Sequence, residues 1–267
     1  MKLKQGLQMI KIVKNYPLYF RDYFRIISNG YITYNLRNGL KFRVRAKTTD
    51  REALNEIWVY NIYLKNGFDI NKDDLIIDIG GHVGLFSILA SKKAPNGKVY
   101  VFEPDPENYE LLNFNISANK ADNIIPIKKA VSFKNESRDL FLSEENQEAH
   151  SFFNKSKNPQ KITVETIALK DFMSKSRISK VDFLKIDCEG AEYEILYNCP
   201  QDILKKISKI SMEYHNLNSI LEKRGLSKNA PEKYNGEDLK SFLEKSGFNV
   251  LLNPYSKRRG MIYASRI

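Results

Sequence analysis

Acidic side chains and one histidine stand at the ends of two apolar runs that have the composition of β-strands. Asp187 follows the run VDFLKI (181–186), and Glu213 and His215 belong to the end of the run KISMEYH (209–215). A carboxylate or an imidazole beside a bound substrate can accept the proton of an attacking hydroxyl group. We therefore take Asp187, Glu213 and His215 as candidate catalytic residues, with Asp187 and His215 as the leading general bases.

The same three side chains offer an alternative chemistry. Two carboxylates and an imidazole from neighbouring strand ends are able to hold Mg²⁺. We expect no metal, and keep Mg²⁺ at Asp187, Glu213 and His215 as the alternative. Of the neighbouring residues, Cys188 is expected to pack away from the site, and Glu192 to cap the following helix or to pair with Lys185. His150 is expected to be a loop residue, with substrate contact as its alternative role.

A glycine-rich turn, DIGGHVG (78–84), follows the apolar run LIIDI (75–79). It departs from the dinucleotide pattern G-x-G-x-x-G, because His82 and Leu85 take the second and third glycine positions. It also lacks the Gly-Lys-Ser/Thr of a phosphate-binding loop. A ligand without phosphate, such as S-adenosylmethionine, suits this turn. Glu103 lies 19 residues beyond Gly84 at the end of KVYVF (98–102) and is placed to accept hydrogen bonds from two ribose hydroxyls.

The elements that must position these residues alternate between strands and helices from Leu75 onward. Strands are expected at 75–79, 98–102, 123–128, 181–186 and 209–214, and helices at 85–93, 106–118 and 191–197. This alternation predicts a parallel sheet with helices on both faces. The last two runs, 248–252 and 261–265, are too close together for a crossover helix and should pair antiparallel.

The first part of the chain is basic and has a different pattern. Residues 1–49 hold eleven basic side chains and one acid, a net charge of +10 of the total +11. We expect a helix over 3–27 that Pro17 interrupts, a hairpin over 31–47 that turns at Asn38-Gly39, and a helix over 50–66. Such a charge can attract an anionic partner, either a membrane surface or nucleic acid, or serve only as a solvated face. The aromatic residues among 1–28 are expected to pack against the protein, with a membrane interface as the alternative.

The cysteine count and the apolar runs indicate where the protein acts. Only Cys188 and Cys199 are present, without metal-ligand spacing, which favours a reducing compartment. No run of 18 apolar residues appears in the sequence, and we find no signal-peptide pattern. The expected location is the cytoplasm, with peripheral membrane contact through residues 1–49 as an alternative.

Six motifs together resemble the FkbM-type methyltransferases in order and spacing. They are DIGGHVGLFSILA, VFEPDPENYELLNFNI, IPIKKAVS, VETIALKDF, VDFLKIDCEGAEYEIL and SMEYH. The upstream stretch NGLKFRVRAKTTDREALNEIWVYNIY is similar to the lead-in of that family, so the resemblance covers residues 38–216. It implies a Rossmann-like class I methyltransferase fold with a mostly parallel seven-stranded sheet that ends in an antiparallel hairpin. It further implies S-adenosylmethionine-dependent O-methylation, commonly of sugar or polyketide hydroxyls.

The resemblance also assigns cofactor contacts, residue by residue. They are expected at Asp78, Gly80, Gly81, His82, Gly84, Glu103, Pro104, Ala130 and Asp187. Asp78 would face the methionine ammonium, the glycines would shape the backbone under the cofactor, and Glu103 would hold the ribose, with Pro104 and Ala130 beside the adenine. His82 departs from the family, which more often has Asn there, and its side chain is expected to point toward the amino-acid end of the cofactor.

These expectations divide the chain into a basic lead-in of helices and hairpin, residues 1–70, and an S-adenosylmethionine-binding methyltransferase domain, residues 71–267, with an insertion at 132–180. The expected partner is a small-molecule or glycan methyl acceptor, and self-association into a homo-oligomer stays open. Two other function classes are alternatives: an RNA methyltransferase and a non-catalytic binding module. No N/D-P-P-Y/F motif or recognisable RNA-binding module supports the first, and the presence of Asp78, Glu103 and Asp187 argues against the second.

Overall fold

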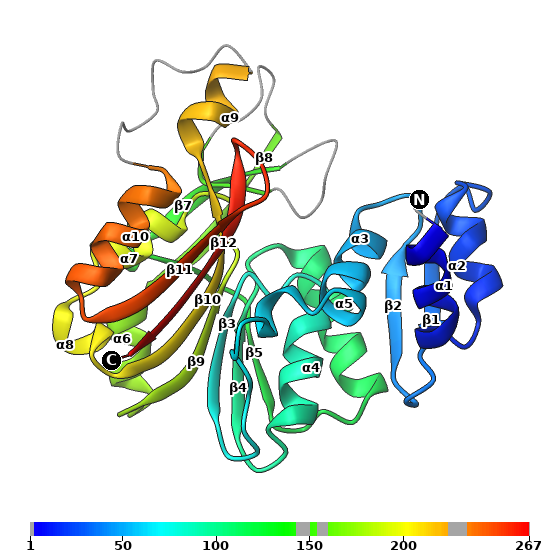
Figure 1. Cartoon of the computed structure of the whole chain (residues 1–267), viewed down its shortest axis with the longest axis horizontal. Helices are drawn as coiled ribbons and strands as arrows, with labels where there is room; N and C mark the ends of the chain where they lie inside the picture. The colour runs from blue at the N-terminus through cyan, green and yellow to red at the C-terminus, as the bar shows by residue number, and fades with distance from the viewer. Residues whose placement is uncertain (1–2, 143–149, 154–159, 224–233, 267) are drawn as a thin grey trace.

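A seven-stranded sheet forms the centre of the computed structural model, which describes residues 3–142, 150–153, 160–223 and 234–266. Its strand order is β11-β12-β10-β9-β3-β4-β5 (Figure 1). The strands are β3 (Leu75–Ile79), β4 (Lys98–Phe102), β5 (Ile124–Ile127), β9 (Val181–Ile186), β10 (Ile207–His215), β11 (Phe248–Pro254) and β12 (Arg259–Arg266). Strands β5, β4, β3, β9 and β10 are parallel, whereas β12 is antiparallel to both β10 and β11. The predicted fold class is confirmed.

Helices cover both faces of this sheet. They are α4 (Leu85–Lys93), α5 (Pro106–Ala118), α6 (Leu169–Lys175), α7 (Glu192–Tyr197), α8 (Gln201–Leu204), α9 (Leu217–Lys223) and α10 (Gly236–Lys245). Because side chains alternate along a strand, each face has its own buried core. Ile76 and Phe183 pack with α4, α5 and the lead-in, while their neighbours Ile77 and Leu184 pack with α6, α7 and α10.

The lead-in packs against the α4/α5 face of the sheet. It contains α1 (Leu3–Ile12), α2 (Tyr16–Tyr23) and the antiparallel strands β1 (Tyr31–Asn35) and β2 (Lys41–Arg45). The predicted helix is interrupted as expected, but the break precedes Pro17, which lies in the first turn of α2. Proline favours that position because the first N–H groups of a helix have no partner within it. Met9, Val13 and Tyr19 are buried in the same core as Ile76, so packing is continuous across residue 70, and the division into two domains stays a prediction.

The helix predicted over 50–66 is wrong as a single element. The chain forms α3 (Asp50–Leu54), a turn of π-helix η1 (Asn55–Val59) and a short 3₁₀ helix η2 (Ile62–Leu64). Asn61 adopts a left-handed conformation with φ 48°, which interrupts the helical path between η1 and η2. Asparagine tolerates this conformation better than most residues. Turns of π-helix occur frequently at functional sites, and this one lies beside the cavity described below.

The insertion adds a small sheet beside the main one. Its strands are β6 (Ala130–Ser132), β7 (Ser137–Leu142) and β8 (Gln160–Ala168), in the order β6-β8-β7. Residues 143–149 and 154–159 of the predicted insertion lie outside the described part of the chain.

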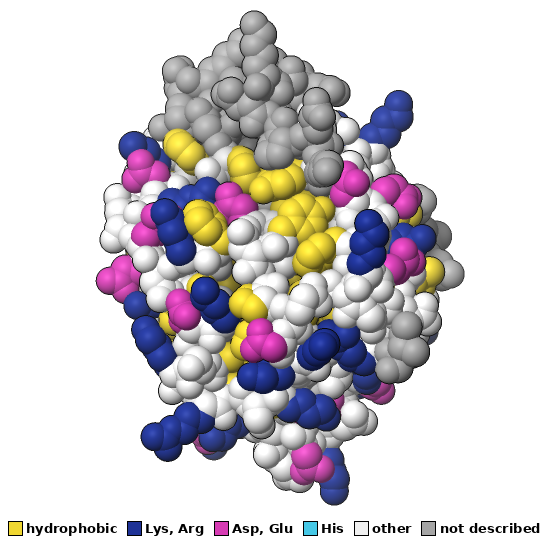
Figure 2. Space-filling model, turned by 90° about the vertical axis from the view of Figure 1, so that its left-hand side faces the viewer, with side chains coloured by type: hydrophobic (Ala, Val, Ile, Leu, Met, Phe, Trp, Pro, Cys, Tyr) yellow, Lys and Arg dark blue, Asp and Glu magenta, His cyan; other side chains and the backbone are white. Residues whose placement is uncertain are grey.

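The outer surface on the α10 and β11 side carries mixed charge. Figure 2 shows basic and acidic side chains interspersed over this face, without a large area of one sign. Among the described residues, no helix is long and apolar enough to cross a membrane.

Candidate active site

A cavity of about 1110 Å³, counting the space at its mouth, opens at the carboxyl ends of β3, β4, β9 and β10. Its walls come from the glycine turn after β3, the ends of these strands, residues of the insertion and residues of the lead-in. Ligand sites in open α/β sheets lie at the carboxyl ends of the parallel strands. The cavity therefore has the position expected of a ligand site in this fold.

The glycine turn lets β3 and β9 end close together. A Cβ atom on Gly80 would lie 1.8 Å from the carbonyl oxygen of Asp187, and one on Gly81 would lie 2.1 Å from a methyl group of Val101. Gly80 also has φ +82°, a conformation that favours glycine. Gly84 is not among the cavity residues, and its missing side chain leaves room for Leu112 of α5. The turn thus needs Gly80 and Gly81 beside the cavity and Gly84 for helix packing.

Glu103 lines the cavity, and hydrogen bonds to both of its carboxylate oxygens fix the side chain. Its Oε2 accepts a hydrogen bond from the backbone N–H of His82 at 2.7 Å, and its Oε1 accepts one from that of Asp105 at 3.0 Å. Asn108 donates to the same Oε1 at 3.4 Å. Burial raises the pKa of Glu103, while His82 and these backbone donors oppose the shift. A carboxylate fixed in this way is a suitable acceptor for paired hydroxyls.

Asp78 lies beneath the cavity and is not among the residues that line it. Its Oδ2 accepts a hydrogen bond from Ser87 at 2.5 Å, and its Oδ1 is 3.1 Å from Nζ of Lys185. Lys185 lines the cavity and donates to the backbone carbonyl of Gly80 at 2.6 Å. The structure therefore places Asp78 as a support for Lys185 and the glycine turn, and direct contact with a methionine ammonium stays a prediction.

His82 points toward the lead-in. Its Nε2 lies 3.1 Å from Oδ1 of Asp50 and 3.1 Å from Nη2 of Arg45. The backbone of His82 is left-handed, with φ 49°. Asparagine, which the resemblance makes the more common residue here, is enriched in that conformation. Asp50 and Arg45 hold the imidazole while His82 also lines the cavity, so its contact with the amino-acid end of the cofactor stays a prediction.

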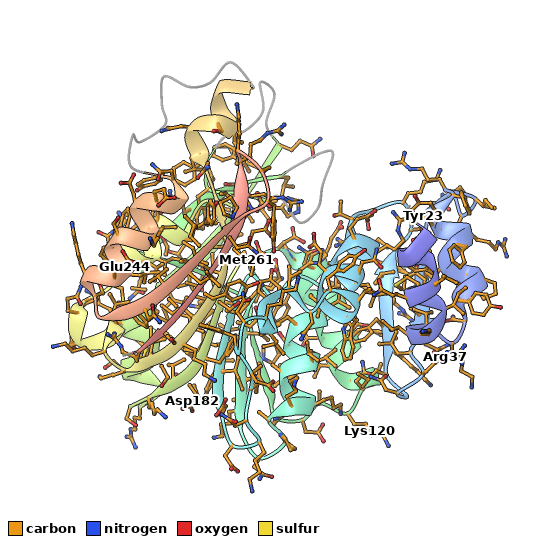
Figure 3. The ribbon with its side chains drawn as sticks, in the orientation of Figure 1. Tyr23, Arg37, Lys120, Asp182, Glu244 and Met261 are labelled. Atoms are coloured by element: carbon orange, nitrogen blue, oxygen red, sulfur yellow. The ribbon has the colours of Figure 1, made fainter. Side chains whose placement is uncertain are left out.

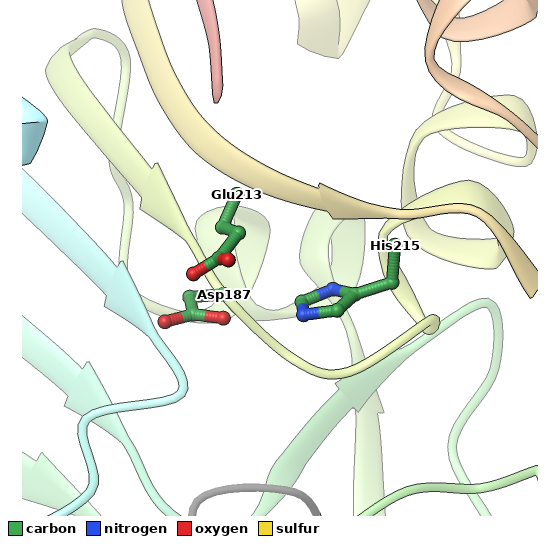
Figure 4. Close-up of side chains that lie close together, drawn as sticks. All are labelled: Asp187, Glu213 and His215. Carbon is green, nitrogen blue, oxygen red and sulfur yellow. The ribbon is translucent and has the colours of Figure 1, made fainter. Parts of the chain in front are cut away.

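Asp187, Glu213 and His215 come together at the ends of β9 and β10 (Figure 4). One potential ligand atom from each lies within 4.8 Å of the others. Asp187 and Glu213 line the cavity, and Oδ2 of Asp187 accepts a hydrogen bond from the hydroxyl of Tyr63 at 2.6 Å. Oε1 of Glu213 forms an ion pair with Nη1 of Arg259 at 3.0 Å, without the alignment of a hydrogen bond.

His215 lies behind these carboxylates, and acidic partners surround its ring. Nδ1 is 3.1 Å from Oε1 of Glu192, and Nε2 is 3.5 Å from Oε1 of Glu189. Burial alone would lower the pKa of His215, but the carboxylates of Glu189 and Glu192 outweigh it and raise the pKa to about 10. For Glu213, burial and the carboxylate of Asp187 raise the pKa to about 8. Asp187 lines the cavity and His215 is not among the lining residues, so the geometry favours Asp187 as the group that can touch a ligand.

The remaining expected residues are distributed as follows. Pro104 and Ala130 line the cavity, as does His150, whose Nε2 is 4.0 Å from Oδ2 of Asp105. Cys188 also lines the cavity, with its Sγ 3.7 Å from Oε2 of Glu192, which corrects the expectation that it packs away.

Glu192 does not pair with Lys185. It accepts hydrogen bonds from the backbone N–H groups of Gly190 at 2.7 Å and His215 at 2.8 Å. It thus ties the start of α7 to the end of β10.

The sequence analysis missed several polar residues of the cavity, among them Glu56, Tyr63, Glu189 and Arg259. Tyr63 is 124 residues away from Asp187 along the chain, and no local pattern joins the two. A basic run at 257–259 was visible, but the contact of Arg259 with Glu213 depends on the antiparallel register of β12 beside β10.

Several known proteins that are similar to this chain are methyltransferases. The chain is 26% identical over 147 residues to the hexuronic acid methyltransferase AglP of Haloferax volcanii, which covers 55% of this chain and 58% of that protein. It is 23% identical over 175 residues to the methyltransferase sdnD of Sordaria araneosa, with coverages of 54% and 68%. The match therefore spans little more than half of the first relative's length.

A solved structure, the methyltransferase FkbM from Methylobacillus flagellatus, aligns with a TM-score of 0.49 at 13% identity, over 76% of this chain and 47% of that one. The methyltransferase FkbM domain, as a family, matches residues 78–250, which include the glycine turn, Glu103, Asp187 and His215. The chain belongs to the FkbM methyltransferase family.

Proposed function

We propose that this protein is an S-adenosylmethionine-dependent O-methyltransferase whose acceptor is a hydroxyl group of a sugar or related polyol. The observation that carries the proposal is that two of the carboxylates lining one cavity, those of Glu103 and Asp187, lie at different places in it. Glu103 is fixed at the glycine turn, and Asp187 lies at the end of β9. The first suits a ribose and the second suits a hydroxyl that must lose a proton.

The residues of the cavity fit the cofactor. Glu103 has both carboxylate oxygens oriented by donors behind it, and Pro104 and Ala130 offer apolar surface beside it. S-adenosylmethionine, when bound, supplies a methyl group on a good leaving group, so orientation of the acceptor provides most of the acceleration. The protein needs to hold the acceptor in line and to receive one proton.

Asp187 is the proposed proton acceptor. Tyr63 donates to its Oδ2, which fixes the carboxylate and leaves Oδ1 available to an acceptor hydroxyl. Asp187 directly follows β9 and stands beside the glycine turn, because its carbonyl oxygen touches Gly80. A hydroxyl that binds at Asp187 is therefore close to the part of the cavity assigned to the cofactor.

Charged groups of both signs line this end of the cavity. The carboxyl groups of Glu56, Asp187, Glu189 and Glu213 lie there with the cations of Lys185 and Arg259, and the raised pKa of Glu213, about 8, favours its neutral form near pH 7. A sugar acceptor is supported by the relative named as a hexuronic acid methyltransferase. RNA methylation is the alternative.

The test is methyl transfer from labelled S-adenosylmethionine into glycan, lipid-linked sugar and RNA fractions. We expect label in a sugar fraction with the wild type. Asp187→Asn should retain cofactor binding and lose turnover by about 10²–10⁴-fold, the usual contribution of a general base.

Asp182→Asn is the matched control. Asp182 lies near the start of β9, at the end of the strand opposite to Asp187 (Figure 3), and accepts a hydrogen bond from the backbone N–H of Leu75. Label in RNA alone, or Asp187→Asn turnover within threefold of wild type, would contradict the proposal.

A divalent cation is the alternative role for the same residues. Asp187, Glu213 and His215 could bind Mg²⁺ with one atom each, and Oε1 of Glu213 is buried without a hydrogen bond. We expect turnover to survive dialysis against a chelator. A loss that added Mg²⁺ restores, together with Mg²⁺ binding that Glu213→Gln weakens, would establish the alternative instead.

A further inference from the structure

An ion pair in the lead-in lies directly behind the glycine turn. Arg45, the last residue of β2, donates from Nε and Nη2 to the carboxylate of Asp50 at 3.1 and 2.9 Å. The backbone N–H of Arg45 adds a third hydrogen bond to Asp50 at 2.8 Å. Both residues are buried, with exposed fractions of 8% and 0%. A buried pair with this many hydrogen bonds forms a fixed unit.

The first connection from this pair to Glu103 passes through His82. Asp50 lies 3.1 Å from Nε2 of His82, and the backbone N–H of His82 donates to Oε2 of Glu103 at 2.7 Å. His82 has φ 49°, a conformation that costs about 1–2 kcal/mol for most residues. The contact of the imidazole with Asp50 favours this conformation, and the conformation directs the N–H at Glu103.

The second connection passes through Asn108. Nη2 of Arg45 donates to Oδ1 of Asn108 at 2.7 Å, and Nδ2 of Asn108 donates to Oε1 of Glu103 at 3.4 Å. The backbone N–H of Asn108 is itself bound to Oδ1 of Asp105 at 2.9 Å, so the residue is fixed at the start of α5. Arg45 also determines which end of the amide faces Glu103, because a guanidinium can only donate to the amide oxygen.

We propose that the Arg45–Asp50 pair of the lead-in positions Glu103, so that cofactor affinity depends on residues outside the nucleotide-binding motifs. One partner acts on each oxygen of the Glu103 carboxylate, through His82 and through Asn108. The inference rests on the proposed binding of S-adenosylmethionine at Glu103. It explains why a histidine stands at position 82 in this chain, since its ring is long enough to reach Asp50.

The experiment measures the dissociation constant of S-adenosylmethionine by calorimetry on the full chain. Asp50→Asn should weaken binding at least about tenfold, because hydrogen bonds to charged groups are worth about 1.5–3 kcal/mol. Asp22→Asn is the matched control. Asp22 is an equally buried acid of the lead-in, and its carboxylate accepts hydrogen bonds from the hydroxyl of Tyr34 and the backbone N–H of Lys47, on the lead-in side and not at the glycine turn. The Asp22→Asn variant should have a lower melting temperature and an unchanged dissociation constant for S-adenosylmethionine.

A second pair of variants separates positioning from general loss of stability. His82→Asn should retain more affinity than His82→Ala, because asparagine tolerates the left-handed conformation and alanine does not. This order should hold even if Asp50→Asn fails to fold. Equal affinities of wild type, His82→Asn and His82→Ala would overturn the inference, as would an Asp22→Asn loss as large as that of Asp50→Asn. Failure of the wild type to bind S-adenosylmethionine would instead overturn the proposed function.

Discussion

At the scale of single residues, Glu103 and Asp187 are two of the carboxylates that line the cavity, and their different surroundings support the different roles proposed for them. Glu103 receives hydrogen bonds from two backbone N–H groups, which do not move with side-chain rotation. Asp187 receives one from Tyr63 and faces other carboxylates. A fixed anion suits binding, whereas a carboxylate held through one oxygen by Tyr63 can accept a proton from a bound hydroxyl on the other.

Glu103→Ala should remove most of the affinity for S-adenosylmethionine. The expected loss is about 2–3 kcal/mol, because the ribose would lose its charged acceptor. Calorimetry measures the loss, and circular dichroism checks that the variant is folded. Glu110 is an exposed acid of α5, the helix that follows Glu103, and Glu110→Ala should bind like the wild type. Near-normal affinity in folded Glu103→Ala would show that the ribose binds elsewhere.

Asp50 should make the stability of the protein depend on acid pH. Burial alone would raise its pKa, but His82 and Arg45 outweigh burial and hold the pKa well below its usual value. A carboxyl whose pKa is lower in the folded state stabilises the fold above the pKa of the unfolded state, about 4. This stabilisation is lost as pH falls below that value. Melting curves at pH 3–7 should show the difference between wild type and Asp50→Asn shrinking below pH 4. A difference that is constant with pH would contradict the assignment.

At the scale of elements, the site depends on how closely β3, β9 and the lead-in approach one another. The turn after β3 is in contact with the end of β9, and η1 and η2 bring Glu56 and Tyr63 to the same cavity. The hydroxyl of Tyr263 on β12 donates to the carbonyl of Ile62 at 2.5 Å, which fixes η2 against the sheet. The irregular helix geometry over residues 55–64 therefore brings the side chains of Glu56 and Tyr63 to the cavity.

Gly80→Ala should destabilise the protein more than a glycine substitution elsewhere with similar backbone geometry. Its Cβ would lie 1.8 Å from the carbonyl oxygen of Asp187, so β3 and β9 would have to separate. Gly39→Ala is the control, because Gly39 has φ +90° and nothing within 4 Å of its added Cβ. We expect about 1–2 kcal/mol lost at Gly39, from conformation alone. Denaturant unfolding should show a clearly larger loss at Gly80, and equal losses would refute the close approach.

At the scale of the whole molecule, the lead-in and the sheet share one core. Tyr19 is 1% exposed and its hydroxyl donates to Asn55 at 3.0 Å, while Tyr34 donates to the buried Asp22 at 2.6 Å. The other aromatic residues of α2, Tyr16, Phe20 and Tyr23, are partly buried against the same core, in agreement with the favoured interpretation. Phe24, at 66% exposure beside Arg25, is different. In Figure 3 the lead-in, marked by Tyr23 and Arg37, lies at the opposite end of the molecule from Glu244.

Two substitutions distinguish packing from membrane contact in the lead-in. Tyr19→Ala should lower the free energy of unfolding by about 3–5 kcal/mol, the usual loss for a buried aromatic residue, and Phe24→Ala by less than about 0.5 kcal/mol. Both values come from denaturant unfolding.

Co-sedimentation with vesicles, with and without anionic lipid, tests the peripheral contact, which stays a prediction. Binding that needs anionic lipid and that Phe24→Ala weakens would support it, and negligible sedimentation with both vesicles would refute it.

Much of the fold could be predicted from sequence because its signals are local. Apolar runs with short spacing predicted β3, β4, β5, β9 and the antiparallel end of the sheet, and glycine with a following acid predicted the turn and Glu103. A strand repeats every two residues and a helix about every 3.6, so such patterns need only a few neighbouring residues to be read. The region 55–64 was not predictable in this way, since its departure from helix depends on contacts with β12.

The sequence by itself determined which residues end each strand, and therefore that Glu103, Asp187 and Glu213 would meet at one edge of the sheet. Only the tertiary structure decided what each of them contacts. Tyr63, Arg45 and Asp50 reach the site from the lead-in through packing across the α4/α5 face, and His82 turns toward them. Contacts between residues far apart in the chain follow from the shape of the whole core, because no repeating pattern along the sequence encodes them.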